Sequence, residues 1–139
     1  MKFLGVPYPV TRNPRGFFRS SNGIDQIKSD LLQLLLTNPG ERVMLPNYGT
    51  ALKSLIFDPN DAQLETAARQ MIINSINQWE PRITIQQIEI NSSVDPNDLD
   101  SNDPKENVEN ILAIKILFFD PENIKEVEEL KLELPLGVA

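Results

Sequence analysis

The apolar residues of this chain change their spacing at Pro81, and this switch limits the folds open to it. Before the proline they recur every three or four residues, as on the buried face of a helix. From Ile83 onward they alternate, as in a strand. A residue that precedes a proline is pushed out of the helical region, so the helix is predicted to end by Trp79. The stripe that this helix buries is predicted to be Leu64, Ala68, Met71, Ile72, Ser75, Ile76 and Trp79.

A second helix is predicted earlier in the chain. Ser21 or Asn22 can cap its start, and the turn over residues 37–40 ends it. Gly40 in that turn accepts the positive φ of a type II turn. The apolar positions of this helix are Ile24, Ile27, Leu31, Leu34 and Leu35.

The segment between the helices contains smaller elements. Val43 and Leu45 predict a short extended piece, and a short helical turn is predicted near Leu52, Leu55 and Ile56. Asp58 and Pro59 are typical of a helix start, with the aspartate as cap and the proline in the first turn.

Three strands are predicted after the switch. In residues 83–90 the apolar parity slips from odd to even, so a bulge is expected near Gln86 and Gln87. Residues 108–119 are apolar on both faces, which predicts a central strand covered on both sides, and residues 127–134 form the third strand. Helices followed by an antiparallel meander predict an α+β fold: two main helices packed on a small antiparallel C-terminal sheet.

The first 20 residues are predicted to form an extended N-terminal arm. Pro7, Pro9, Pro14 and Gly16 exclude a helix there and leave little reason for a strand. Its aromatic residues either pin the arm to its own domain or contact a neighbour. Residues 21–139 are predicted to form a single α+β domain. The aromatic residues of the arm are Phe3, Tyr8, Phe17 and Phe18.

The composition excludes several classes of function. The chain has neither cysteine nor histidine, which removes disulfides, thiolate metal sites and the usual general base. Its net charge of −7 is unsuited to nucleic acid, and no apolar run approaches the roughly 20 residues of a membrane span. We therefore expect a soluble intracellular protein that is no enzyme, holds no cofactor and binds neither nucleic acid nor membrane.

The acidic segment 92–107 partly matches a calcium-binding loop. Asp98, Asp100, Asn102 and Glu109 occupy the first, third, fifth and twelfth positions of that pattern. Asp103 replaces the glycine that permits the sharp turn, so a solvated loop is predicted and no metal site.

Glu80 and Arg82 around Pro81 allow two interpretations. The first is a surface ion pair beside a helix stop, worth about 0–1 kcal/mol, and the residues alone favour it. The second is a rigid recognition element held outward by Pro81, with Arg42 or Glu41 neutralising it from within. The last strand also allows two interpretations of equal weight. Its edge is either blunted by charged residues or receives a partner's strand.

Three separated segments resemble one known family. They are LLLTNPGERVMLPNYGTALKSLIFDPND (residues 34–61), the helix that ends in INQWEPRITI, and the closing strands. Together they resemble the small baseplate wedge family of contractile phage tails, often labelled lysozyme-like, which has relatives in type VI secretion. The resemblance covers roughly residues 20–134. Tyr48 departs mildly from it, because phenylalanine is common at that position.

The resemblance implies a structural subunit of the virion tail baseplate, assembled in the host cytoplasm. It implies six copies near the tail tube or hub, docked on other wedge proteins and templating the first ring of the tail sheath protein by strand addition. A secretion-system baseplate component is the alternative, and a peptidoglycan hydrolase is the alternative of another class. Partner-binding residues are expected to be Glu80, Pro81 and Arg82 with Glu41, Arg42 and Tyr48, and the strand residues Leu130, Leu132 and Leu134.

Overall fold

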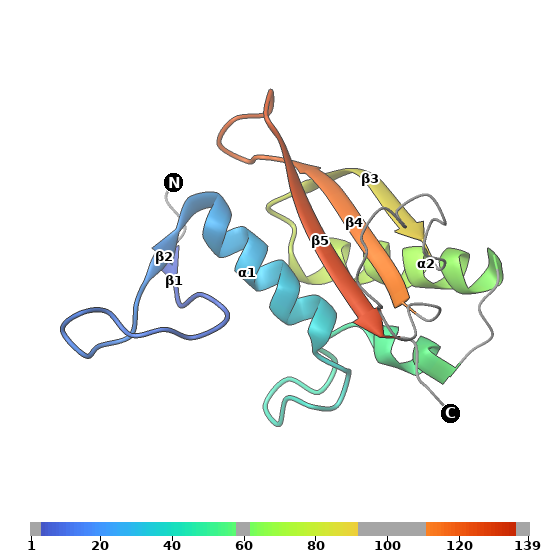
Figure 1. Cartoon of the computed structure of the whole chain (residues 1–139), viewed down its shortest axis with the longest axis horizontal. Coiled ribbons are helices and arrows are strands. Elements are labelled where there is room, and N and C mark those ends of the chain that lie inside the picture. The colour runs from blue at the N-terminus through green and yellow to red at the C-terminus, as the bar shows by residue number, and fades with distance from the viewer. Residues whose placement is uncertain (1–3, 58–61, 92–110, 136–139) are drawn as a thin grey trace, which may run out of the picture.

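The computed structural model describes residues 4–57, 62–91 and 111–135. It confirms the predicted α+β fold, with two main helices and a three-stranded antiparallel sheet of order β3-β4-β5 (Figure 1). None of the described helices has the length and apolarity that crossing a membrane requires. The elements are β1 (Leu4–Gly5), β2 (Ser21–Asn22), α1 (Gly23–Leu36), the 3-10 helix η1 (Ala51–Phe57), α2 (Ala62–Trp79), β3 (Thr84–Asn91), β4 (Ile111–Phe119) and β5 (Val127–Pro135).

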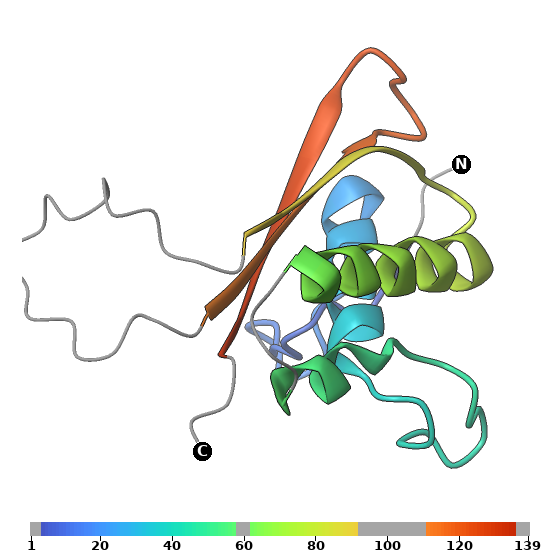
Figure 2. The same ribbon diagram turned by 90° about the vertical axis from the view of Figure 1, so that its right-hand side faces the viewer.

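Both main helices lie on the same side of the sheet (Figure 2). Their apolar stripes pack against every second residue of β4, which is the central strand. The apolar residues of the helices and of the strands therefore form one core, as the sequence predicted. The most deeply buried members of this core are Leu31, Leu52, Ala68, Ile72, Ile116 and Phe118.

The predicted bulge is present in β3. The register against β4 shifts between Ile85 and Gln87, so Ile83 before it and Ile88 and Ile90 after it all face the core. A bulge inserts one unpaired residue and so restores the side-chain parity that the sequence appeared to lose.

The prediction that β4 is covered on both sides is wrong. Its even-numbered side chains are buried, but Ala113, Lys115, Leu117 and Phe119 on the other face remain half-exposed. The reason is that α1 and α2 share one face and no described element covers the other. Lys115 lies there between Glu89 and Glu129, at 3.6 and 3.5 Å, so the face carries a cross-strand charge ladder.

The N-terminal arm contains a short strand, against expectation. Leu4 pairs with Asn22 and Gly5 with Ser21, and an isolated bridge joins Arg12 to Phe18. The arm therefore folds back on itself beside the start of α1, because its prolines leave these few residues free to pair. Its large apolar side chains stay exposed, Phe17 by 71% and Phe18 by 72%.

The extended piece predicted at Val43 and Leu45 is also wrong, because turns occupy residues 43–44 and 46–47. Leu45 N–H donates to the carbonyl of Arg42 at 3.3 Å, and Gly40 N–H donates to that of Pro46 at 2.7 Å. Gly40 has a φ of +93°, as its predicted turn requires, and η1 is the predicted short helical turn. The predicted start of the long helix at residues 58–59, the first residues of the strand predicted from residue 108 and the acidic segment with its calcium pattern lie outside the described residues.

The loop over residues 37–50 is closed by a close backbone approach at Gly49. Thr50 N–H donates to the carbonyl of Thr37 at 2.8 Å, and a Cβ on Gly49 would lie 2.3 Å from that carbonyl oxygen. Gly49 also has a φ of +125°, which disfavours any other residue.

We predict that Gly49→Ala lowers the free energy of unfolding by more than about 2 kcal/mol, because it adds this clash to the backbone strain. Gly40→Ala is the matched control, since its φ is also positive but no atom lies within 4 Å of its Cβ position. It should cost only about 1 kcal/mol. Urea denaturation measures both, and equal losses would contradict the proposed closure of the loop.

Candidate docking site where the second helix meets the sheet

Arg82 joins three elements at the end of α2. Glu80 N–H donates to the carbonyl of Ile76 at 2.8 Å, which continues the helix by one residue and turns the Glu80 side chain inward. The guanidinium of Arg82 donates to both carboxylate oxygens of Glu80, and its Nη2 donates to Asp30 Oδ2 of α1 at 2.6 Å. These contacts hold the pKa of Arg82 above its usual value, the Glu80 hydrogen bonds contributing most. The start of β3 is thus tied to both helices.

A chain of hydrogen bonds links this ion network to the N-terminal arm. Gln26 is 4% exposed, and its Nε2 donates to Asp30 Oδ1 at 2.8 Å and to the carbonyl of Val6 at 3.4 Å. A Cβ on Gly5 would lie 2.6 Å from that same nitrogen, so the glycine permits the close approach of the arm.

An aromatic pair ties the loop over residues 37–50 to the end of α2. The rings of Tyr48 and Trp79 meet edge to face, with centroids 5.3 Å apart and an interplanar angle of 67°. The guanidinium of Arg42 lies 4.3 Å from the centroid of the Tyr48 ring, in a cation–π contact. Burial raises the pKa of the Tyr48 hydroxyl, aided by the charges of Asp30 and Glu80 and opposed by Arg42.

Glu41 stabilises the same loop at its surface. Its carboxylate accepts hydrogen bonds from the backbone and side chain of Asn38, at 3.1 and 3.0 Å, and lies 3.7 Å from Lys53 Nζ. The backbone N–H of Asn38 is the main cause of its lowered pKa, and Lys53 adds to the effect. The group that accompanies Glu80 around Arg82 is therefore Asp30, whereas Arg42 and Glu41 have their own contacts in the loop.

The prediction that Glu80 and Arg82 both point outward is wrong. Glu80 is 5% exposed, and the Arg82 side chain is 28% exposed. A carboxylate at this depth needs a charged partner, and Arg82 supplies one by turning inward. Exposed at this join are Pro81 and part of the Arg82 guanidinium, so the pair is no incidental surface contact either.

Sequence reasoning missed Asp30 and Gln26. Both lie among the apolar residues of α1, and the signal available was a carboxylate and an amide beside the buried positions Ile27 and Leu31. A polar residue beside a buried stripe indicates a buried partner but does not identify it.

In β5 the side chains of the predicted residues face the core, whereas the free edge of the strand is formed by its backbone. Leu130 and Leu134 are each 6% exposed and Leu132 is partly buried, so their side chains pack inward and stabilise β5. Asp120 N–H donates to the carbonyl of Glu126, and in an antiparallel pair the bonded positions alternate from there. The backbone groups directed away from β4 therefore belong to Val127, Glu129, Lys131 and Glu133.

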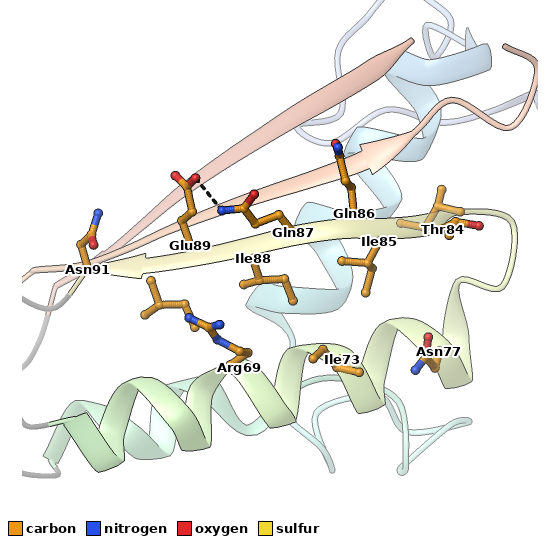
Figure 3. Close-up of a pocket in the computed structure, with 12 residues that line it drawn as sticks. Arg69, Ile73, Asn77, Thr84, Ile85, Gln86, Gln87, Ile88, Glu89 and Asn91 are labelled. Carbon is orange, nitrogen blue, oxygen red and sulfur yellow. Dashed lines mark hydrogen bonds between the residues drawn. The ribbon is translucent and has the colours of Figure 1, made fainter. Parts of the chain in front are cut away.

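A groove of about 790 Å³ runs between α2 and the edge of β3 (Figure 3). Ile85 and Ile88 point toward α2 in this view, whereas Gln87 and Glu89 point away from it and share a hydrogen bond of 3.1 Å. Of the lining residues that the structure describes, Glu89 is the one that carries a carboxylate.

Comparison with known proteins gives concordant matches. A family model described as "Baseplate wedge protein gp25" matches residues 21–116. Baseplate protein W of Escherichia phage P2 is 31% identical over 72 residues, which span 52% of this chain and 63% of that protein's length.

Solved structures resemble the fold. A putative tail lysozyme from Geobacter sulfurreducens matches with a TM-score of 0.63 and 21% identity, over 81% of this chain and 90% of its own. A chain of the anti-feeding prophage baseplate matches with a TM-score of 0.63 and 18% identity, over 99% of this chain and 88% of its own. A chain of the postcontracted pyocin R2 baseplate matches with a TM-score of 0.52 and 20% identity, over 92% of this chain and 99% of its own. At these identities the three structures establish a shared fold.

We predict that stability falls as the pH rises above about 10, in part through Tyr48. Burial keeps the folded hydroxyl protonated to a higher pH than the unfolded one, so its contribution is complete below about pH 10 and is lost above it. Urea denaturation between about pH 8 and 11 should show a shallower fall for Tyr48→Phe than for the parent. Tyr8→Phe, on the exposed arm, is the control and should follow the parent; equal slopes for both variants would contradict the assignment.

Proposed function

We propose, on the premise that this chain belongs to the baseplate wedge protein gp25 family, that it docks on other wedge proteins and templates the first sheath ring by strand addition. Membership makes it a structural baseplate component of a contractile phage tail or of a related injection system. The docking, the sheath contact, the six copies and the position near the tail tube or hub are parts of the proposal.

The observation that carries the docking proposal is the convergence of three distant segments around Arg82. Asp30, Glu80 and the Tyr48–Trp79 pair fix the surface that Pro81 and Arg82 present, before any partner arrives. A surface that is already ordered loses less conformational entropy on binding. In this proposal Glu80 shapes the site, Arg82 offers its exposed edge to a carboxylate or carbonyl, and Glu41, Arg42 and Tyr48 hold the adjoining loop.

We predict that Arg82→Lys weakens docking by about tenfold or more, because lysine keeps the positive charge beside Asp30 and Glu80 but has no planar fork. Binding is measured on wedges assembled without this subunit, and circular dichroism checks that the variant is folded. Lys28→Gln is the control, since it breaks the ion pair with Glu128 at 2.7 Å, which has similar exposure. Normal docking by Arg82→Lys would refute the role of Arg82.

The sheath proposal depends on the free edge of β5. Backbone groups at alternate residues point away from β4, and the side chains of Leu130, Leu132 and Leu134 anchor the strand to the core. Such an edge suits a partner strand that bonds through its main chain. Glu129 and Lys131 lie 2.9 Å apart, and their hydrogen bond lowers the pKa of Glu129 and raises that of Lys131.

We predict that Lys131→Pro blocks sheath initiation, because proline removes an N–H directed outward while leaving the bonds between β4 and β5 in place. Lys131→Ala is the control and should allow a sheath to form. Electron microscopy of assembled tails gives the result, and thermal melting confirms that both variants fold. A sheath that grows normally on Lys131→Pro would exclude this edge as the template.

The two alternatives have different support. A baseplate component of an injection system agrees with the same fold matches, and neighbouring genes decide between it and a phage tail. A peptidoglycan hydrolase agrees with one structural neighbour described as a tail lysozyme. Glycoside hydrolysis, however, needs two carboxylates across a cleft. Among the described residues, the groove is lined by one carboxylate, and Asp30 and Glu80 are both bound to Arg82.

A further inference from the structure

The loop over residues 37–50 carries two adjacent apolar side chains at its tip that lie outside the hydrophobic core of the described residues. Val43 and Met44 are each 92% exposed, more than the other large apolar residues described, and Leu45 beside them is 38% exposed. The loop projects below α1, away from the sheet (Figure 1). Single exposed apolar residues are common on protein surfaces, but a fixed adjacent pair at the end of a projecting loop is not.

This tip is held in place by the rest of the loop. The bond from Thr50 N–H to the carbonyl of Thr37 closes the base, and the bond from Gly40 N–H to the carbonyl of Pro46 ties the two sides together. Tyr48 then packs on Trp79, which fixes the loop to α2. Val43 and Met44 are therefore presented at a defined position.

The charges beside the tip are already compensated within the molecule. Glu41 interacts with Asn38 and Lys53, and Arg42 lies over the Tyr48 ring. A partner that meets the tip therefore gains from apolar burial rather than from new ion pairs. A convex pair of this size fits a concave pocket, in the way that a few buried anchors dominate a protein interface.

The loop and the join between α2 and β3 lie on the same side of the molecule (Figure 2). Tyr48 and Trp79 connect them, so the tip and the Pro81–Arg82 surface belong to one rigid unit. One partner can then contact both. The net charge of −7 disfavours the other source of apolar contact, an anionic lipid surface.

We propose that Val43 and Met44 form an apolar anchor that inserts into an apolar pocket of the same wedge protein on which Arg82 docks. The anchor rests on the proposed docking function and adds a second contact to it, chemically distinct from the first. Its contribution depends on burial, whereas that of Arg82 is electrostatic and weakens with salt.

The test uses the full chain with the double substitution Val43→Thr and Met44→Gln, which keeps the side-chain sizes but makes both polar. The probe is the wedge complex assembled without this subunit. We expect the dissociation constant to be about 10- to 100-fold higher than that of the parent. This ratio should change little between about 0.05 and 0.5 M salt. Ile124→Thr, at a position 76% exposed in the turn between β4 and β5, is the matched control and should bind like the parent.

Arg82→Lys in the same assay separates the two proposals. If it weakens binding while the double variant binds like the parent, the anchor is refuted and docking through Arg82 stands. If both variants bind like the parent, docking at this side of the molecule is refuted as well. Vesicles of phosphatidylcholine and phosphatidylglycerol are the second probe. Binding to them that the double variant loses would overturn the protein pocket in favour of lipid.

Discussion

The ion network of Arg82 with Glu80 and Asp30 is the interaction on which the arrangement of this molecule depends. Glu80 is buried, and a buried carboxylate without a partner costs several kcal/mol. Arg82 offsets that cost through a two-pronged contact and reaches α1 with the same guanidinium. The end of α2, the start of β3 and the middle of α1 are thereby held together by one charged side chain.

This arrangement separates two kinds of surface. On one side, the ion network and the Tyr48–Trp79 pair hold side chains and a projecting loop in fixed positions, which suits recognition by a folded partner. On the other, both helices cover the same face of the sheet, and β3 and β5 are its edge strands among the described elements because β4 lies between them. The main chain of an edge strand offers hydrogen bonds at a regular spacing, which suits the addition of another strand. The proposed role uses both surfaces, the first for docking on a wedge protein and the second for strand addition.

Most of the fold could be predicted where one local rule decides the outcome. Residue spacing predicted the buried stripe of α2, the bulge beside Gln86 and the meander. The errors arose where spacing is insufficient. Val43 and Leu45 alternate like a strand but lie in a loop of turns, and no described strand pairs with them. Residues on both faces of β4 are apolar, yet helices cover only one face. The binding role of the candidate site stays a prediction, and the orientation expected for Glu80 was wrong, since this side chain points inward.

The sequence by itself determined where α2 ends, because Pro81 disfavours the helical conformation in the residue before it, and where β3 changes parity, because side chains on a strand alternate strictly. Both are constraints between neighbouring residues. Only the tertiary structure decided that Asp30 would join Glu80 around Arg82, since 52 positions separate Asp30 from Arg82 in the chain. The depth of Glu80 and the exposure of Val43 and Met44 were decided in the same way. Burial depends on what the rest of the fold brings alongside a residue, and neither side-chain chemistry nor spacing contains that information.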